Sequence, residues 1–220
     1  MSDRGQIVVL AKAPVPGRVK TRLCPPCTPR QAATVAAAAL DDTMDAVSSM
    51  PAVRRSLVLD GRYPAPPGWR ILRQRDGALG DRLAGAFADT AVAGAATVLV
   101  GMDTPQLTAA QLDAALGLLV APAGPDAVLG LADDGGWWAL GLREPGPAEL
   151  LRDIPTSTSV TGALTLAALR AYGLTVEQLP SLRDVDTAGD AHAVAACCAP
   201  GSRFARAVAG NVPVTTGVGR

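Results

Sequence analysis

Short apolar runs alternate with longer helical patterns along almost the whole chain. The runs predicted to be strands are Ile7–Ala11, Ser56–Asp60, Arg70–Arg73, Thr97–Gly101, Ala127–Leu131, Trp137–Leu142 and Leu174–Leu179. The early runs are continuously apolar, which is typical of strands that are buried on both faces of a sheet. The alternation therefore predicts an α/β fold, with a doubly wound, mostly parallel sheet between two layers of helices.

Helix start signals recur between these runs. Thr28–Gln31 combines an N-cap residue, a proline at the first helical position and a glutamine that completes a capping box, and Thr108–Gln111 repeats the box. A third helix is expected to start at Thr187–Asp190, and two more at Asp81–Val92 and Gly162–Ala171. We expect a single domain over residues 1–209 and a flexible tail over 210–220, where no helical pattern is found.

Composition and apolar patterning argue against a nucleic-acid-binding protein, a membrane-spanning protein and a secreted protein. The chain has 220 residues with 20 basic and 20 acidic side chains, and this neutrality argues against binding to nucleic acid. No apolar stretch approaches the roughly 18 residues of a membrane-spanning helix. The residues before the first strand lack the apolar core of a signal peptide, so we expect a cytoplasmic protein.

Cys24 and Cys27 have the spacing of a zinc knuckle or a redox pair. A zinc site would need two more ligands, and the sequence offers one histidine, His192, and the adjacent pair Cys197–Cys198. Structural or incidental thiols are therefore the favoured interpretation, with a metal or redox role as the alternative.

Four cations fall within eleven residues directly after the first predicted strand: Lys12, Arg18, Lys20 and Arg22. Pro14 stiffens this loop and Gly17 turns it. Loops at strand ends of α/β proteins bind ligands, and clustered lysines and arginines there favour phosphate. The loop lacks the first glycine of a P-loop and the glycines of a dinucleotide motif. The alternative is a solvated basic loop.

Carboxylates follow two other predicted elements. Asp103 ends the strand Thr97–Gly101, where it can ligate Mg²⁺ or Mn²⁺ together with a diphosphate. Asp184 and Asp186 alternate in an extended stretch, so both side chains point to the same side and could share a metal. The alternative is that these residues cap the next helices, although Thr108 and Thr187 already serve as caps.

Two glycine-containing turns complete the candidate sites. Asp133–Trp138 reads as a β-hairpin turn that could also approach a ligand, with Trp138 as a platform for a sugar or acceptor. Gln74–Arg82 places an amide beside glycines, so Gln74 could read a nucleobase edge. An ordinary loop before a helix is the alternative.

Together these motifs resemble a bacterial family of small GT-A-like transferases, long labelled a domain of unknown function and often described as glycosyltransferases. The matching segments are Lys12–Leu23 (K-x-P-x-x-G-x-x-K-T-R-L), Gln74–Arg82, Gly101–Pro105, Asp134–Trp137 and Asp184–Thr187. The first and last are also similar to the guanylyltransferases that activate 2-phospholactate. Trp137 stands where the family has tyrosine, and Met102 where a small serine is typical.

The resemblance implies a nucleotide-diphospho-sugar transferase fold that uses Mg²⁺ or Mn²⁺. It favours glycosyl transfer from a nucleoside diphosphate sugar to a small acceptor. The first alternative is a nucleotidyltransferase that joins a nucleoside monophosphate, taken from a nucleoside triphosphate, to a phosphorylated small acid. The second is a catalytically inactive nucleotide-binding regulatory domain.

The resemblance also assigns candidate roles. Asp103, Lys20 and Asp134 are the candidate catalytic residues, and Asp103, Asp184 and Asp186 the candidate metal ligands. The nucleotide would contact the residues of the first loop and of the glutamine turn, together with Asp103: Lys12, Pro14, Gly17, Arg18, Lys20, Arg22, Gln74 and Gly80. The acceptor would contact the hairpin turn: Asp134, Gly135, Gly136 and Trp138.

Overall fold

The computed structural model describes residues 5–214 and contains one seven-stranded sheet, in the order β3-β2-β1-β4-β6-β5-β7. The strands are β1 (Gln6–Lys12), β2 (Arg54–Asp60), β3 (Arg70–Arg73), β4 (Thr97–Gly101), β5 (Ala127–Ala132), β6 (Trp137–Leu142) and β7 (Val176–Leu182). β6 runs antiparallel to its neighbours β4 and β5, and the other pairings are parallel. The predicted α/β fold with a mostly parallel sheet is confirmed.

The described residues also form six α-helices and two 3₁₀ helices, which lie between the strands or, for the last two helices, after β7. They are α1 (Pro29–Ser48), α2 (Leu79–Thr90), α3 (Ala109–Val120), α4 (Thr161–Ala171), α5 (Ala188–Cys197), α6 (Arg203–Asn211), η1 (Thr21–Leu23) and η2 (Gly146–Asp153). The capping boxes predicted at Thr28, Thr108 and Thr187 are all formed. None of the helices in the described part of the chain combines the length and apolarity needed to cross a membrane.

Several boundaries differ by one to three residues from those predicted, and two of the differences have a clear local cause. α2 begins at Leu79 rather than Asp81, because the Asp81 carboxylate accepts a hydrogen bond from the Ala78 amide and so belongs to the first turn. β7 begins at Val176 rather than Leu174, because its pairing with β5 starts there. The apolar pattern cannot show which residues the neighbouring strand will pair.

α6 was not predicted, because Phe204 and Val208 are its only large apolar residues buried in the core. It packs against α1 and continues to Asn211, and the following Val212 is also buried. The expected limit of the domain at residue 209 therefore falls inside this helix. Of the expected tail, residues 215–220 lie outside the described part of the chain.

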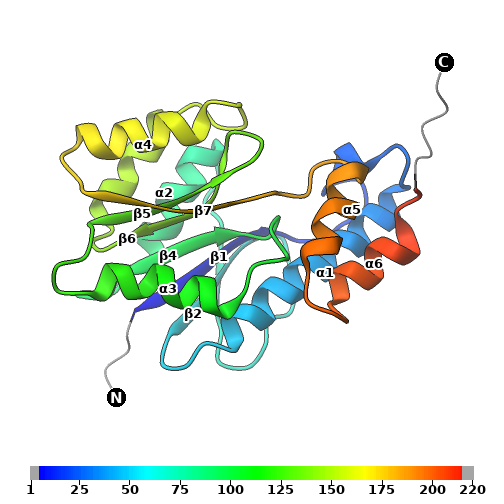
Figure 1. Cartoon of the computed structure of the whole chain (residues 1–220), viewed down its shortest axis with the longest axis horizontal. Helices are drawn as coiled ribbons and strands as arrows, with labels where there is room; N and C mark the ends of the chain where they lie inside the picture. Colours follow the sequence, from blue (N-terminus) through cyan, green and yellow to red (C-terminus); the bar gives the residue numbers. More distant parts are fainter. Residues whose placement is uncertain (1–4, 215–220) are drawn as a thin grey trace.

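Helices cover both faces of the sheet (Figure 1). Ile7 and Val9 of β1 face the core beneath α1 and α3, whereas Val8 between them faces α2, η2 and α4. A third apolar cluster joins η1, α1, α5 and α6 around Leu23 and Phe204. This cluster brings the C-terminal helices against the start of the chain, although they are far apart in the sequence.

The topology places the candidate segments at one edge of the sheet. β1, β4 and β7 run in the same direction, so their carboxyl ends meet at that edge. The antiparallel β6 starts there, and the turn from β5 to β6 lies there too. The first loop, Asp103, the hairpin turn and the Asp184–Asp186 segment are therefore neighbours, as is usual for ligand sites in open α/β sheets.

Candidate active site

Two adjoining cavities open at this edge. The first has a volume of about 570 Å³ and is lined by five cations, Lys12, Arg18, Lys20, Arg22 and Arg82, with Asp103 and Asp186. The second has a volume of about 480 Å³ and is lined by Asp103, Asp134, Asp184 and Asp186, with Arg22 as its one cation. We call them the cationic cavity and the acidic cavity. Asp103 and Asp186 line both of them.

Lys20 connects three segments of the site. Its Nζ lies 2.6 Å from Asp103 Oδ1 and also donates to the carbonyl oxygen of Val185. The Val185 amide in turn donates to the Asp103 carbonyl oxygen at 2.9 Å. The Lys20 side chain is 6% exposed and that of Asp103 is 51% exposed. Lys20 has φ 49°, a left-handed conformation that is costly for a residue with a side chain and is often found at functional sites.

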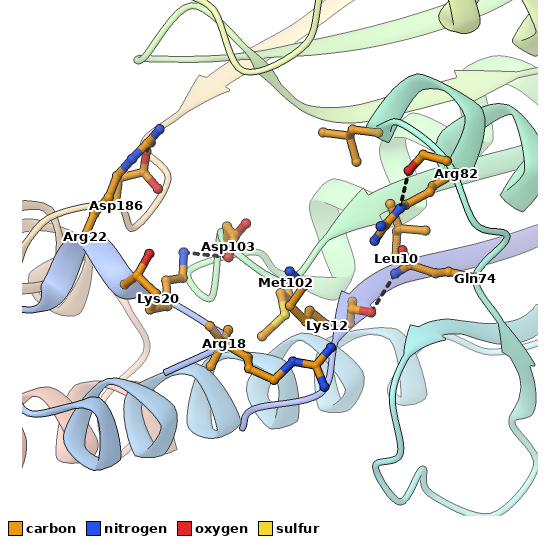
Figure 2. Close-up of a pocket in the computed structure, with 15 residues that line it drawn as sticks. Leu10, Lys12, Arg18, Lys20, Arg22, Gln74, Arg82, Met102, Asp103 and Asp186 are labelled. Carbon is orange, nitrogen blue, oxygen red and sulfur yellow. Dashed lines mark hydrogen bonds and ion pairs between the residues drawn. The ribbon is translucent and has the colours of Figure 1, made fainter. Parts of the chain in front are cut away.

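The other cations of the cationic cavity differ in their partners. Arg22 forms an ion pair with Asp186 (2.6 Å), and Arg82 forms one with Asp60 (3.3 Å). Lys12 and Arg18 have no ion pair with any residue that the structure describes. Figure 2 shows them in the cationic cavity, between the Lys20–Asp103 pair and Arg82. These two side chains are therefore free to bind an anion.

Three carboxylates gather beside the Lys20–Asp103 pair. Asp134, Asp184 and Asp186 each offer an oxygen atom, and these atoms lie within 4.8 Å of one another. Burial, together with the negative charges of Asp134 and Asp186, raises the pKa of Asp184 to about 6. A divalent cation would relieve this repulsion, and carboxylate oxygens are its preferred ligands.

The structure thus brings together two of the three candidate metal ligands, Asp184 and Asp186, but the third carboxylate of the cluster is Asp134. Asp103 lies beside the cluster with its carboxylate paired to Lys20. Only the tertiary fold brings the hairpin turn against the Asp184–Asp186 segment. The sequence spacing therefore could not show which carboxylates meet.

Gln74 lines the cationic cavity, but its amide nitrogen is already engaged in the sheet. Nε2 donates to the carbonyl oxygens of Ala11 (2.7 Å) and Val58 (3.2 Å). Gly80 is buried, and a Cβ atom there would lie 2.3 Å from the Leu151 carbonyl oxygen, so it lets α2 pack closely on η2. Neither cavity is lined by Gly80, Pro14 or Gly17.

The hairpin turn forms as predicted and carries Asp134 to the acidic cavity. The Gly136 amide donates to Asp134 Oδ1 at 2.7 Å, which holds the carboxylate in place. Gly136 and Trp137 line the acidic cavity, while Gly135 packs against the backbone of Ser159. Trp138 is 4% exposed and donates from Nε1 to the Pro180 carbonyl oxygen at 3.1 Å. Trp137, not Trp138, is therefore the tryptophan that faces the acidic cavity, and Trp138 lines a smaller cavity of about 110 Å³ beside it.

One set of lining residues was not predicted from the sequence. From the loop after η2 to the first residue of α4, five hydroxyl-bearing residues line the acidic cavity: Thr156, Ser157, Thr158, Ser159 and Thr161. The sequence does contain a pattern that could have indicated this wall of the cavity, namely five hydroxyl-bearing residues within six consecutive positions. The signal is weak, because serine and threonine are common in ordinary loops.

The cysteines lie away from both cavities. Cys27 is buried near α6, its Sγ donates to the Asn211 carbonyl oxygen at 3.6 Å, and burial raises the pKa of its thiol. All four cysteines are free. No cysteine takes part in a potential metal-ligand cluster within residues 5–214. The arrangement supports the structural interpretation of Cys24 and Cys27.

The fold is similar to several solved structures. A putative nucleotide-diphospho-sugar transferase from Desulfovibrio desulfuricans G20 has a TM-score of 0.81 and 24% identity, covering 96% of this chain and 98% of that one. A cytidylyltransferase from Leptospira borgpetersenii has a TM-score of 0.54 and 12% identity (85% and 83% covered). Rv0371c from Mycobacterium tuberculosis, in complex with manganese, has a TM-score of 0.52 and 22% identity (86% and 97% covered).

A family model also matches the sequence, over residues 33–158, and that family is described as an uncharacterized protein conserved in bacteria. No curated protein matches the chain. The family match spans more than half of the chain and includes three of the five motifs that carried the resemblance, namely Gln74–Arg82, Gly101–Pro105 and Asp134–Trp137. This protein belongs to the DUF2064 family.

Proposed function

We propose that this protein is a metal-assisted transferase with a nucleotide-activated donor, and that it transfers a sugar from a nucleoside diphosphate sugar to a small acceptor. The observation that carries the proposal is the junction of a cationic and an acidic cavity at Asp103 and Asp186. A donor of this kind has a multiply charged diphosphate joined to a hydroxyl-rich sugar. The cationic cavity offers charges that suit the diphosphate, and the adjoining acidic cavity offers a place for the sugar.

The cationic cavity is suited to the nucleoside diphosphate. Lys12 and Arg18 lie in it without an ion pair in the described structure, and Arg22 stands at the border of the two cavities. Arginine and lysine bind phosphate oxygens through charge-assisted hydrogen bonds, which are about twice as strong as neutral ones. The diphosphate would therefore lie against the first loop, and the sugar joined to it would point toward Asp103.

The carboxylate cluster fits a divalent cation. Asp134, Asp184 and Asp186 would hold Mg²⁺ or Mn²⁺ through hard oxygen donors. When bound, such an ion stabilises negative charge on a leaving diphosphate, which is often the largest contribution to this kind of catalysis. The role of Lys20 is to hold Asp103 and Val185 together at the border of the cavities, beside the cluster.

The relatives of known structure support a nucleotide-dependent transferase in this fold. One is described as a putative nucleotide-diphospho-sugar transferase, another as a cytidylyltransferase. Nucleotidyl transfer is the alternative, because the cationic cavity would also accept a nucleoside triphosphate. The two reactions differ in the product released, which is a nucleoside diphosphate in the first and pyrophosphate in the second.

The test is a thermal-shift panel of nucleotide sugars, nucleoside diphosphates and nucleoside triphosphates, each with and without Mn²⁺. A ligand that binds only the folded state raises its stability in proportion to the logarithm of ligand concentration over Kd. We expect stabilisation by one nucleotide sugar that depends on Mn²⁺, followed by release of nucleoside diphosphate in a turnover assay. Release of pyrophosphate from a triphosphate would support the alternative instead.

A matched pair of variants tests whether the Mn²⁺-dependent stabilisation comes from the carboxylate cluster. Asp134→Asn removes one carboxylate of the cluster, whereas Glu144→Gln removes an exposed carboxylate beyond the far end of β6. The first should lose the Mn²⁺-dependent part of the shift and the second should keep it. If no nucleotide stabilises the wild-type protein with Mn²⁺, the proposal is wrong.

A further inference from the structure

The segment from the loop after η2 to the first residue of α4 forms one wall of the acidic cavity, and we call residues 156–161 the hydroxyl loop. Two of its hydroxyls are engaged within the loop. Thr158 Oγ1 and Thr161 Oγ1 lie 3.1 Å apart, and Thr161 Oγ1 donates to the Pro155 carbonyl oxygen at 2.9 Å. These bonds shape the loop at the point where α4 begins.

The other three hydroxyls are available to a ligand. Thr156, Ser157 and Ser159 have no side-chain hydrogen bond to any described residue, and all three line the acidic cavity. Ser157 and Ser159 are exposed and Thr156 is half-buried. Ser157 also has φ 60°, a left-handed conformation of the kind often found at ligand sites.

Close backbone contacts fix the hydroxyl loop against the turn that carries Asp134. The Gly162 amide donates to the Gly135 carbonyl oxygen at 2.8 Å. A Cβ atom on Gly135 would lie 1.9 Å from the Ser159 carbonyl oxygen, and one on Gly162 would lie 2.5 Å from that of Gly136. Only glycines allow this approach, so the loop and the carboxylate cluster are held together as one preorganised unit.

The rest of the acidic cavity includes an apolar surface. It is formed by Leu10, Leu79, Leu83, Leu99 and Trp137. A cavity with an apolar surface and a few fixed hydroxyls suits a ligand with apolar C–H faces and hydroxyl edges. A sugar ring or a cyclic polyol has this character.

The charges of the acidic cavity decide which rings it can accept. Arg22 is the one cation in the lining, and it is already paired with Asp186. Asp103 is paired with Lys20, so Asp134 and Asp184 remain, and a bound divalent cation would only balance these two. A carboxylated or phosphorylated ring would therefore find no cation to offset its own charge.

We infer that the hydroxyl loop and Trp137 form a subsite that selects an uncharged, hydroxyl-rich ring. The inference rests on the proposed function and names the chemistry of the group that occupies the acidic cavity. Two sources share this chemistry, the sugar of the donor and a sugar or polyol acceptor. In either case Thr156, Ser157 and Ser159 are specificity-determining residues.

The experiment measures binding calorimetrically in the presence of Mn²⁺, with UDP, UDP-glucose and UDP-glucuronate as one series and GDP, GDP-mannose and GDP-mannuronate as the other. We expect the neutral sugar nucleotide to bind about tenfold more tightly than its diphosphate, as two or three hydrogen bonds allow. The uronate should bind no better than the diphosphate. If the ring belongs to the acceptor, a methyl glycoside should instead bind to the complex with Mn²⁺ and diphosphate.

Two variants locate the effect, Ser157→Ala and Ser159→Ala, with Ser181→Ala on β7 as the control. Ser181 is exposed and lines neither the cationic nor the acidic cavity. Each loop variant should weaken binding of the neutral ring about threefold to tenfold and leave diphosphate binding unchanged. The control should match the wild-type protein in both measurements.

The outcomes separate this inference from the proposed function. If the diphosphate binds with Mn²⁺ but the neutral ring adds no affinity from either source, the subsite is wrong and the proposed function stands. Equal binding of uronate and neutral sugar, or loop variants that bind the neutral ring like the wild type, would also overturn it. If no nucleotide binds with Mn²⁺, both proposals are wrong.

Discussion

Lys20 Nζ lies 2.6 Å from Asp103 Oδ1, and this ion pair joins the first loop to the end of β4. The lysine side chain is almost fully covered while the aspartate is half-exposed, so the two partners contribute unequally. The same ammonium group donates to the Val185 carbonyl oxygen, next to Asp184 and Asp186. One buried charge therefore holds the two cavities in their relative positions.

The unequal exposure predicts an unequal response to substitution. Asp103→Asn leaves a buried ammonium without a carboxylate, and we expect it to lower the free energy of unfolding by about 1–2 kcal/mol and to abolish turnover. Lys20→Met leaves only a half-exposed carboxylate and should cost less than about 1 kcal/mol. Urea denaturation measures both, and the double variant should cost less than the sum. Additive effects would show that the pair is not coupled.

Lys12 and Arg18, the cations of the cationic cavity that have no ion pair with a described residue, should affect ligand binding more than stability. Arg18→Ala is expected to weaken nucleotide binding about tenfold and to make the remaining affinity less sensitive to salt. Its melting temperature should match that of the wild type. Arg170→Ala, which removes an exposed arginine of α4, is the control. Unchanged affinity in Arg18→Ala would remove the first loop from the phosphate site.

The raised pKa of Asp184, about 6, predicts pH-dependent metal binding. A divalent cation binds the carboxylate and not the acid, so Mn²⁺ affinity should fall as the pH drops through about 6. Titration of Mn²⁺ at several pH values measures the effect. A Mn²⁺ affinity that is constant across this range would contradict the assignment of Asp184 to the metal site.

The same pKa sets the sign of an effect on stability without metal. Asp184 has a higher pKa in the folded state than its ordinary value of about 4, so its stabilising contribution is present below about pH 4 and is lost as the pH rises through about 6. Asp184→Asn should therefore raise the melting temperature of the metal-free protein at about pH 8 and not at about pH 4. It should also lose stabilisation by Mn²⁺. A lower melting temperature at the higher pH would show that the ionised Asp184 carboxylate stabilises the fold rather than destabilising it.

Two glycines with positive φ provide a matched test of the contact between the hydroxyl loop and the hairpin turn. Gly135 has φ +89° and no room for a Cβ atom, whereas Gly17 has φ +78° and nothing within 4 Å of that position. Gly135→Ala should lower the free energy of unfolding by more than about 2 kcal/mol, and Gly17→Ala by about 1 kcal/mol from backbone strain alone. Equal losses in urea denaturation would show that the contact with Ser159 is not tight.

Much of the local structure was predictable because its causes are local. The strand Thr97–Gly101 and the helix after Thr108 have the predicted start residues, since burial pattern and capping chemistry act between residues a few positions apart. α6 is an exception, because its short apolar face becomes meaningful only when α1 lies against it.

The two tryptophans show the limit of such local patterns. Alternation along a strand indicates that Trp137 and Trp138 face opposite sides, but it does not say which side holds the acidic cavity. The neighbouring strand β5 decides which side each ring takes, because Gly130 leaves space for the Trp138 ring. A Cβ atom on residue 130 would lie 2.4 Å from that ring. Trp138 therefore enters the core and Trp137 faces the acidic cavity.

The sequence by itself determined the α/β architecture, the helix starts and the segments that carry charge at strand ends. Only the tertiary structure decided which of those charges meet. Lys20, Asp103 and Val185 are far apart in the chain, as are Asp134 and Asp184. Their contacts depend on strand order and on helix packing, and these arise from the burial of apolar surface over the whole domain rather than from any single motif.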